Sequence, residues 1–346
     1  MPMPTDRPGI LKRSAIRAGS SPAFARLVEL LERTDPERSD LLRVITYHRV
    51  DWPGAVPGSY PRLMVSPEVF AAQMGFIARR FRVLSMPELL AAARTGAGLP
   101  PRALLITFDD AYTDFATHAW PVLQQEALPA TLFVPTAFPD DPTRVFWWDR
   151  LYHALITTHC DRVVDSPIGR LPLGTPAARE TAFTRLRVHV KQQPHSVAVA
   201  WVERFSSELG VSPPATSVLG WDDLRRLAAE GVTLGCHTRT HALANRVAAD
   251  ELRSEAVGSR QDLEREIGPT LPIFAYPSGA FDDRAVEHLA GEGFELAFTT
   301  RRGINEWKTA DRLRLRRIHV GYRTSMPFLR FQLLSRAVRW NPISAG

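Results

Sequence analysis

From about Arg43 onward, short apolar and β-rich segments alternate with longer segments in which apolar residues recur at helical spacing. The short segments predict strands at Val44–Tyr47, Leu104–Phe108, Thr131–Val134, Val232–Cys236, Ile273–Tyr276, Leu296–Thr299 and Leu315–Val320. The longer segments predict helices at Pro67–Arg80, Met86–Ala93, Thr113–Gln125, Trp221–Glu230, Asp250–Ile267 and Asp283–Gly291. Repeated alternation of strand and helix favours a parallel α/β sheet or barrel over an antiparallel sandwich.

Three segments depart from this alternation. Residues 1–40 are polar at first and then helical in pattern around Phe24–Arg33, which predicts an N-terminal appendage. Residues 140–217 contain an aromatic-rich stretch and two helix-like runs, Ala177–Val190 and Ser196–Leu209, which predict a helical insertion. The main domain is then expected over residues 41–322, with a helical extension over residues 323–346.

Composition narrows the class of protein. The 346 residues suit one barrel-sized domain with additions, and 45% apolar and 23% charged residues are typical of a globular protein. The net charge of +6 forms no block of the kind that binds nucleic acid. The two cysteines form no CxxC pair, so neither a disulfide framework nor a zinc knuckle is expected.

The basic N-terminal stretch has no apolar core of the kind that a signal peptide needs, and no apolar run approaches the ~18 residues of a membrane span. We therefore expect a cytoplasmic protein without a transmembrane segment. The N-terminal helix and Phe328–Leu334 are candidates for peripheral membrane contact, although ordinary packing is the favoured role.

Two adjacent carboxylates, Asp109 and Asp110, end the apolar strand Leu104–Phe108. Asp is also favoured at turns and helix N-caps, so this pair alone leaves a structural role open. A second cluster, His237 and His241, directly follows the apolar strand Val232–Cys236.

The two histidines are spaced i, i+4, which on a helical turn lets both imidazoles face one metal ion. This spacing alone is a weak signal, but functional side chains of a parallel barrel gather at the carboxyl ends of its strands. A catalytic metal typically has three protein ligands and one open place for water. We interpret Asp110 as the third ligand and Asp109 as the base that takes a proton from water.

These motifs resemble those of the polysaccharide deacetylases that share the NodB-homology domain. Thr107–Asp110 (TFDD) matches the first motif of that family, and His237–His241 (HTRTH) matches the second. The resemblance implies a distorted (β/α) barrel with fewer than eight strands. It also implies that Asp109 is the base, that Asp110, His237 and His241 bind a divalent metal, usually Zn²⁺, and that the Thr238 hydroxyl braces the loop.

A third family motif is only partly matched by Phe274–Gly279. Ala275 replaces the usual Arg and Ser278 the usual Tyr, and Ala111 replaces the Gly after TFDD. The resemblance implies that the backbone N–H of Ser278 helps to hold the oxyanion, and a backbone donor survives a change of side chain. The missing Arg normally orients the base, so either another Arg substitutes for it or the base is held less tightly.

His319, in Leu315–Gly321, takes the position of the late family histidine that acts as general acid, a role that suits an ordinary pKa near ~6.5. The alternative is an outward-facing histidine on an exposed strand. His48 could lie on the same rim, where a hydrogen-bonded structural role is favoured. For Phe146–Trp148, anchoring in the core is favoured over stacking on sugar rings. His118, His153, His159 and His195 have no partner at ligand spacing.

The expected function is that of a metal-dependent hydrolase that removes N-acetyl groups from an amino sugar in a poly- or oligosaccharide or a biosynthetic intermediate. The acetylated sugar is then the expected partner. Two alternatives stay open: a related C–N hydrolase acting on a lipid-linked sugar or a non-sugar amide, and an inactive carbohydrate-binding protein. Loss of the motif Arg at Ala275 favours the inactive protein, whereas retention of all three ligand residues disfavours it.

Overall fold

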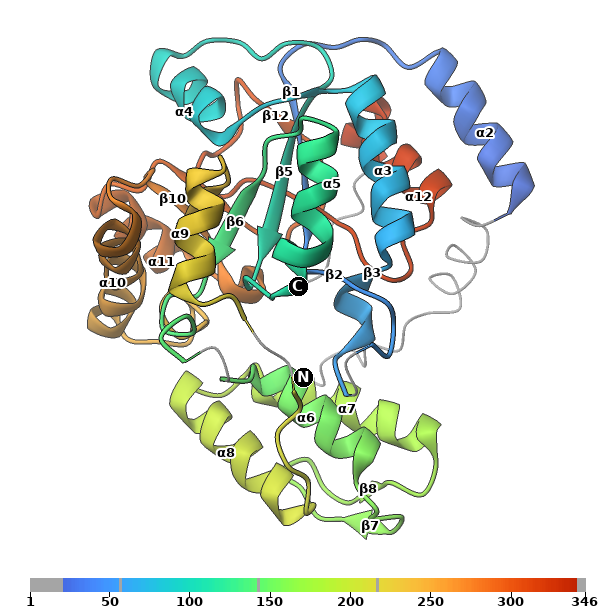
Figure 1. Cartoon of the computed structure of the whole chain (residues 1–346), viewed down its shortest axis with the longest axis vertical. Coiled ribbons are helices and arrows are strands. Elements are labelled where there is room, and N and C mark those ends of the chain that lie inside the picture. Colours follow the sequence, from blue (N-terminus) through green and yellow to red (C-terminus); the bar gives the residue numbers. More distant parts are fainter. Residues whose placement is uncertain (1–20, 56–57, 142–143, 216–217, 341–346) are drawn as a thin grey trace.

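A curled, mainly parallel sheet forms the centre of the molecule in a computed structural model that describes residues 21–55, 58–141, 144–215 and 218–340 (Figure 1). Seven strands form its continuous path, in the spatial order β11 (Leu296–Phe298), β10 (Ile273–Ala275), β9 (Thr233–Cys236), β6 (Thr131–Val134), β5 (Ala103–Asp109), β1 (Leu41–Tyr47) and β12 (Asn305–Glu306). Only β12 on this path is antiparallel to its neighbour. This arrangement confirms the predicted distorted (β/α) barrel.

Short strands complete the sheets. β4 (Arg82–Val83) pairs with β5, and β13 (Ile318–His319) pairs with β1. Leu315 also forms a parallel bridge with Phe298 of β11. The segment from Leu315 to His319 therefore joins the two sides of the curled sheet, although only its last part has the strand conformation predicted for Leu315–Val320. Two separate pairs are β2 (Arg49–Val50) with β3 (Met64–Val65), and β7 (Val163–Val164) with β8 (Leu171–Pro172).

Helices cover the outer face of the sheet. They are α3 (Pro67–Arg80), α5 (Trp120–Gln125), α9 (Trp221–Ala229), α10 (Ala249–Ile267) and α11 (Asp283–Gly291). The buried side of α4 (Met86–Thr95) packs instead with the apolar cluster of the barrel interior. The predicted helix at Thr113–Gln125 is divided, because a π-helical segment, Phe115–Ala119, precedes α5. Short 3₁₀ segments occur at Pro61–Leu63, Pro277–Gly279 and Ser335–Trp340. Among the described helices, none is both long and apolar enough to cross a bilayer.

Strand alternation explains which side chains face the barrel interior. Leu105 and Phe133 belong to the apolar cluster of the interior, whereas Ile106 and Leu132 pack in the cluster with the outer helices. Successive residues of a strand point to opposite faces. On β5, residue Asp109 therefore follows Leu105 in projecting inward, at the carboxyl end of the strand.

A second helical group lies beyond the carboxyl ends of β5 and β6 (Figure 1). It contains α6 (Trp147–Thr157), α7 (Pro176–Val190) and α8 (His195–Glu208), with its own apolar cluster built around residues such as Phe183. These helices fall within the predicted insertion. The boundaries of the predicted regions remain predictions, and residues 1–20 and 341–346 lie outside the described residues.

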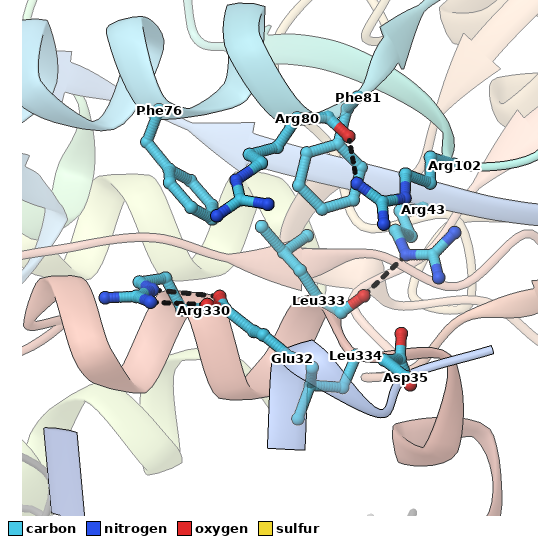
Figure 2. Close-up of a pocket in the computed structure, with 10 residues that line it drawn as sticks. All are labelled: Glu32, Asp35, Arg43, Phe76, Arg80, Phe81, Arg102, Arg330, Leu333 and Leu334. Carbon is cyan, nitrogen blue, oxygen red and sulfur yellow. Dashed lines mark hydrogen bonds and ion pairs between the residues drawn. The ribbon is translucent and has the colours of Figure 1, made fainter. Parts of the chain in front are cut away.

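Helices α2 (Pro22–Arg33) and α12 (Met326–Leu333) pack together beside α3. Figure 2 shows the pocket between them, where Arg330 pairs with Glu32 and the Arg43 Nε donates to the Leu333 carbonyl at 2.6 Å. Because Arg43 lies near the start of β1, this pocket is at the amino end of that strand. It is thus separate from the aspartates at the carboxyl end of β5.

Candidate active site

The two aspartates stand at a sharp change of backbone direction. Asp109 ends β5, and Asp110 and Ala111 follow with φ of 75° and 52°. Left-handed backbone costs a non-glycine residue about 1–2 kcal/mol, which accounts for the family glycine at the position of Ala111. Neither aspartate caps the helical segment that follows, which has Asp114 at its N-cap. The alternative helix-cap role is therefore wrong.

A loop, not a helical turn, carries the two histidines. His237 follows β9, and both Thr238 and His241 have positive φ, at 61° and 62°. The expected helical turn is therefore wrong. Glu255 of α10 holds the loop by accepting hydrogen bonds from two consecutive backbone amides at 2.8 and 2.9 Å. The Thr238 hydroxyl donates to the His237 carbonyl at 2.6 Å.

Asp110, His237 and His241 come together in the folded chain. One donor atom from each lies within 4.8 Å of the others, and all three residues are buried. The Asp110 Oδ1 is 3.5 Å from the His237 Nε2 and 3.4 Å from the His241 Nε2. Ligands about 2.1 Å from a tetrahedral Zn²⁺ are about 3.4 Å apart. The same Oδ1 is buried and has no hydrogen-bond partner among the described residues, as suits a metal ligand.

Protonation states also fit a divalent cation. The His237 Nδ1 lies 2.7 Å from the Ala275 carbonyl, so it must donate there and leave Nε2 free to bind a metal. Burial lowers the pKa of His241 to about 3, partly offset by the Asp110 charge. Burial raises the pKa of Asp110, but His237, His241 and His48 together outweigh burial and the net shift is downward. Metal binding requires deprotonated ligand atoms, and the shifts of His241 and Asp110 both favour that form.

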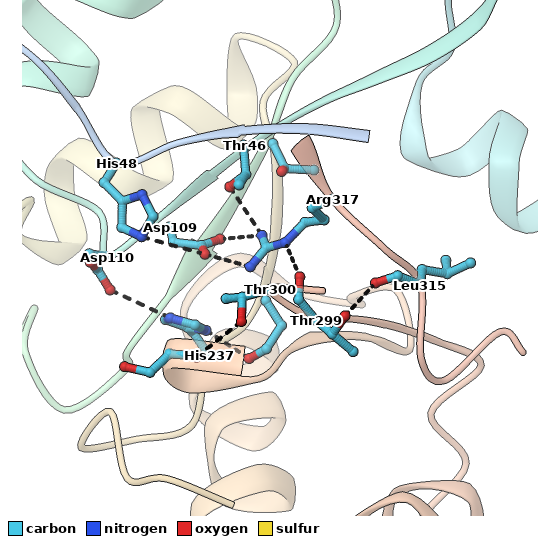
Figure 3. A network of polar contacts seen from close by, with 12 residues as sticks. Thr46, His48, Asp109, Asp110, His237, Thr299, Thr300, Leu315 and Arg317 are labelled. Atoms are coloured by element: carbon cyan, nitrogen blue, oxygen red, sulfur yellow. Dashed lines mark hydrogen bonds and ion pairs between the residues drawn. The ribbon is translucent and has the colours of Figure 1, made fainter. Parts of the chain in front are cut away.

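Arg317 supplies the guanidinium that the third motif lacks. Its Nη1 and Nη2 donate to the two carboxylate oxygens of Asp109 at 2.8 and 2.7 Å, and its Nε donates to the Thr299 carbonyl at 2.9 Å (Figure 3). Both partners are buried, with 0% and 3% of their side chains exposed. Of the two alternatives left open by Ala275, substitution by another Arg is correct.

The ion pair with Arg317 fixes the charge of Asp109. Burial raises the pKa of this carboxyl, but the charge and hydrogen bonds of Arg317, together with the charges of His237 and His48, outweigh burial and hold the pKa well below its usual range. Asp109 is therefore ionised at neutral pH, which is the form that a base needs. Sequence reasoning missed Arg317 because it lies 208 residues after Asp109 and matches no family motif.

Two further histidines, His48 and His319, lie near Asp109. The His48 Nε2 is 3.9 Å from the Asp109 Oδ2, and the His48 and His319 rings are 6.1 Å apart. His48 makes no hydrogen bond among the described residues, and the structural role favoured for it remains a prediction. His319 is not outward-facing, because its Nε2 is buried and has no hydrogen-bond partner among the described residues. Burial lowers its pKa well below 6.5, so the argument from an ordinary histidine pKa is wrong.

Ser278 lies at the carboxyl end of β10 in left-handed backbone, with φ of 54°. The next residue is Gly279, where a Cβ would lie 2.0 Å from the Thr300 Oγ1, so only glycine fits. The Thr300 hydroxyl donates to the Ser278 carbonyl at 3.2 Å. The turn therefore has a fixed shape, and the role of the Ser278 N–H remains a prediction.

The helical group of α6–α8 contacts the candidate metal-ligand cluster, as we name Asp110, His237 and His241 together. Trp148 is buried, as the core role predicted, and its ring also lies 4.6 Å from that of His241. The Trp148 Nε1 donates to the Tyr112 hydroxyl at 3.1 Å, and that hydroxyl donates to the buried Asp149 at 2.6 Å. Because the Nδ1 of His241 has no hydrogen-bond partner among the described residues, ring packing holds this imidazole.

Known proteins similar to this chain identify its family independently of the site geometry. The polysaccharide deacetylase family model matches residues 96–297, more than half of the chain. Poly-β-1,6-N-acetyl-D-glucosamine N-deacetylase of Escherichia coli K12 is 24% identical over 226 residues, which covers 65% of this chain but only 29% of that relative.

Solved structures share the fold. The Streptococcus pyogenes deacetylase PplD in complex with acetate is 18% identical, with a TM-score of 0.58 over 86% of this chain and 99% of the other. IcaB from Ammonifex degensii is 20% identical, with a TM-score of 0.55 over 86% and 98% of the two chains. The matched family model and the shared fold agree with the TFDD and HTRTH motifs, and this chain belongs to the polysaccharide deacetylase family.

Proposed function

We propose that this protein is a divalent-metal-dependent hydrolase that removes the N-acetyl group from an amino sugar in a poly- or oligosaccharide or a biosynthetic intermediate. The observation that carries this proposal is that two adjacent aspartates have different partners. Asp109 is paired with Arg317, whereas Asp110 faces His237 and His241. The name of the Escherichia coli relative supports an N-acetylated amino sugar as the substrate class.

The residues divide the chemistry between them. A bound divalent cation, most simply Zn²⁺, supplies a Lewis acid that polarises the acetyl carbonyl and makes water more acidic. Asp110, His237 and His241 hold this cation. Asp109 takes a proton from the attacking water, and the backbone N–H of Ser278 donates to the oxyanion that forms on the carbonyl oxygen.

Collapse of the tetrahedral intermediate breaks the C–N bond and releases acetate and the free amine. The leaving nitrogen needs one proton, and Asp109 has taken one from water. We assign to His319 the transfer of this proton from Asp109 to the nitrogen, because the Asp109 carboxylate that is restored when the proton leaves raises the pKa of the buried His319. His319 then acts only after Asp109 has been protonated, because burial keeps it neutral in the free protein.

The alternative of an inactive carbohydrate-binding protein rested on the loss of the motif Arg at Ala275. Arg317 removes that argument, since it forms a two-point ion pair with the base. A binding module has no need of a buried carboxylate held in this way.

The assignment of roles is tested with Asp109→Asn. We expect zinc content equal to wild type and a loss of acetate release of at least about 10³-fold, because the amide cannot take the proton. Asp110→Asn is the matched variant at the adjacent position, and there both zinc content and acetate release should be lost. Asp109→Asn with wild-type turnover, or without bound zinc, would contradict the proposal.

A further inference from the structure

Two cations lie near the end of α7, and one of them acts on the candidate metal centre. Arg187 and Lys191 are four residues apart, so their side chains project from the same side of the helix. Lys191 interacts electrostatically with both Arg187 and Asp110, which brings the end of α7 close to the metal-ligand cluster. His195, at the start of α8, likewise acts on the charge of His241. The α7–α8 connection therefore lies beside the candidate active site.

Among the described residues, neither cation has a carboxylate within ion-pair distance. Neither Arg187 nor Lys191 makes a side-chain hydrogen bond or ion pair among the described residues, and the Arg187 Nε is buried without a partner. The Arg187 guanidinium lies 5.8 Å from the centre of the Tyr60 ring. By contrast, Arg179 on the same helix donates to several backbone carbonyls, the Leu173 carbonyl at 2.8 Å among them. A cation removed from water without a partner is costly, and burial lowers the pKa of Lys191 to about 8.

Further cations approach from the barrel side. Arg62 and Arg323 are exposed, and their charges act on Tyr60 together with that of Arg187. A Cβ on Gly321, two residues after His319, would lie only 2.5 Å from the Arg62 carbonyl oxygen, so these backbone segments touch beside the candidate acid. One carboxylate, Glu180, belongs to this group.

Glu180 does not neutralise the cluster, because it accepts a hydrogen bond from the Tyr152 hydroxyl at 2.8 Å and forms no ion pair among the described residues. Three cations, Arg62, Arg187 and Arg323, therefore act on Tyr60, and Lys191 adds a fourth positive charge next to Arg187. The nearby Asp149 is already engaged by the Tyr60 amide and the Tyr112 hydroxyl. A concentration of unpaired positive charge beside a catalytic centre attracts and holds an anionic ligand. Guanidinium and ammonium groups both bind phosphate and carboxylate through charge-assisted hydrogen bonds.

We propose that Arg187 and Lys191, with Arg62 and Arg323 at the rim, form an anion subsite beside the metal centre. The acetylated amino sugar that this protein acts on therefore carries a negatively charged phosphate or carboxylate group. This inference rests on the proposed deacetylase function and names its substrate class. The subsite holds the charged group while the acetamido group reaches Asp109 and the metal ligands.

Acetate release is the first test, on zinc-loaded full-length protein. The substrates are neutral N-acetylglucosamine oligomers, the same oligomers bearing a phosphate ester, and oligomers that alternate N-acetylglucosamine with a uronic acid. We expect kcat/KM for one charged series to exceed that for the neutral series by about tenfold or more, since one charge-assisted hydrogen bond is of that size. The two charged series distinguish phosphate from carboxylate.

Variants connect this preference to the residues. The pair Arg187→Gln with Lys191→Met should reduce the preference to near one, whereas Lys191→Arg, which keeps the charge, should retain most of it. Arg204→Gln on α8 removes an exposed charge that pairs with Glu208, and it should leave the preference at the wild-type value. Equal losses on charged and neutral oligomers in the double variant would overturn the subsite.

Binding separates the subsite from the reaction. Calorimetric titration with N-acetylglucosamine 6-phosphate and with N-acetylglucosamine needs no turnover, and the double variant should lose the tighter binding of the phosphate. If charged and neutral oligomers are deacetylated equally well, the subsite is wrong and the proposed function stands. If no sugar is deacetylated but phosphate binding is lost in the double variant, the proposed function is wrong and the anion subsite stands.

Discussion

Two charged regions of this molecule lie close together and differ in whether their charges are paired within the protein. At the centre of the barrel, Asp109 and Arg317 form a buried two-point ion pair with nearly ideal distances. Beside it, Arg187 and Lys191 are partly desolvated cations with no counterion among the described residues. The first region is complete within the protein, and the second becomes complete only with a ligand.

This difference distinguishes charges that hold the catalytic residues in place from charges that select the substrate. A buried pair is costly to break because one partner is then left without its counterion. An unpaired cation already bears part of that cost in the free protein, and an anion that binds relieves it. Charge variants in the two regions should therefore fail in different ways.

Arg317→Met breaks the first region and should have the largest effect. We expect acetate release to fall by at least about 100-fold and the free energy of unfolding to fall by about 3–5 kcal/mol, because Asp109 is left buried and unpaired. Without Arg317 the pKa of Asp109 rises, so the acid limb of the kcat/KM profile should move to higher pH. Activity across pH and urea unfolding measure the two effects.

The pH dependence of stability has a definite sign. The folded pKa of Asp109 is below its unfolded value of about 3.9, so its contribution is fully present above that pH and is lost as the pH falls through the folded value. The destabilisation by Arg317→Met should therefore be larger at neutral pH than in acid. Arg317→Lys, which keeps the charge but not the fork, should be intermediate. An unmoved acid limb would show that Arg317 does not set the charge of Asp109.

Trp148→Ala tests the contact between α6 and His241, beside both regions, and should have an intermediate effect. The ring packs against His241, whose Nδ1 has no hydrogen-bond partner within the described residues. We expect zinc affinity to fall by about tenfold, as for other losses of support around a metal ligand, with a stability loss of about 3 kcal/mol. Zinc competition with a chelator measures the first effect and thermal unfolding the second.

Trp201→Ala is the control for this change, because Trp201 packs against the same apolar cluster but does not contact His241. It should destabilise α6–α8 without the loss of zinc affinity. Equal zinc affinities in the two variants would show that ring packing does not hold the ligand.

Raising the pH tests the charge of Lys191 in the second region and should have the smallest effect. Burial lowers the pKa of Lys191 to about 8, so the positive charge is present below that pH and is lost above it. At pH 9 about a tenth of Lys191 is protonated, and the preference for charged oligomers should decline severalfold. Because arginine stays protonated, Lys191→Arg should keep the preference at pH 9. The same decline in both proteins would assign it to another group.

The strands and the metal-ligand cluster were predictable because each is a local pattern. TFDD and HTRTH each follow an apolar strand, and strand order brings β5 and β9 to opposite sides of β6. Arg317 was not predictable, since a guanidinium reaches Asp109 only through closure of the sheet by a segment 208 residues away.

Other misses have the same physical origin. The left-handed backbone at His241 replaces the expected helical turn, and it depends on Glu255 from a helix later in the chain. The histidine pKa assumed for His319 failed because burial is a property of the folded protein. His195 had no partner at ligand spacing, and only the approach of α8 to the loop brings it near the metal-ligand cluster.

The position of Arg317 links folding to the appearance of activity. A chain in which the segment around Leu315 has not yet docked carries Asp109 without its counterion, and burial then favours the protonated carboxyl. Such an intermediate has the proposed metal ligands in place after β5 and β9 but lacks a working base. Closure of the barrel is therefore the event that completes the proposed catalytic site.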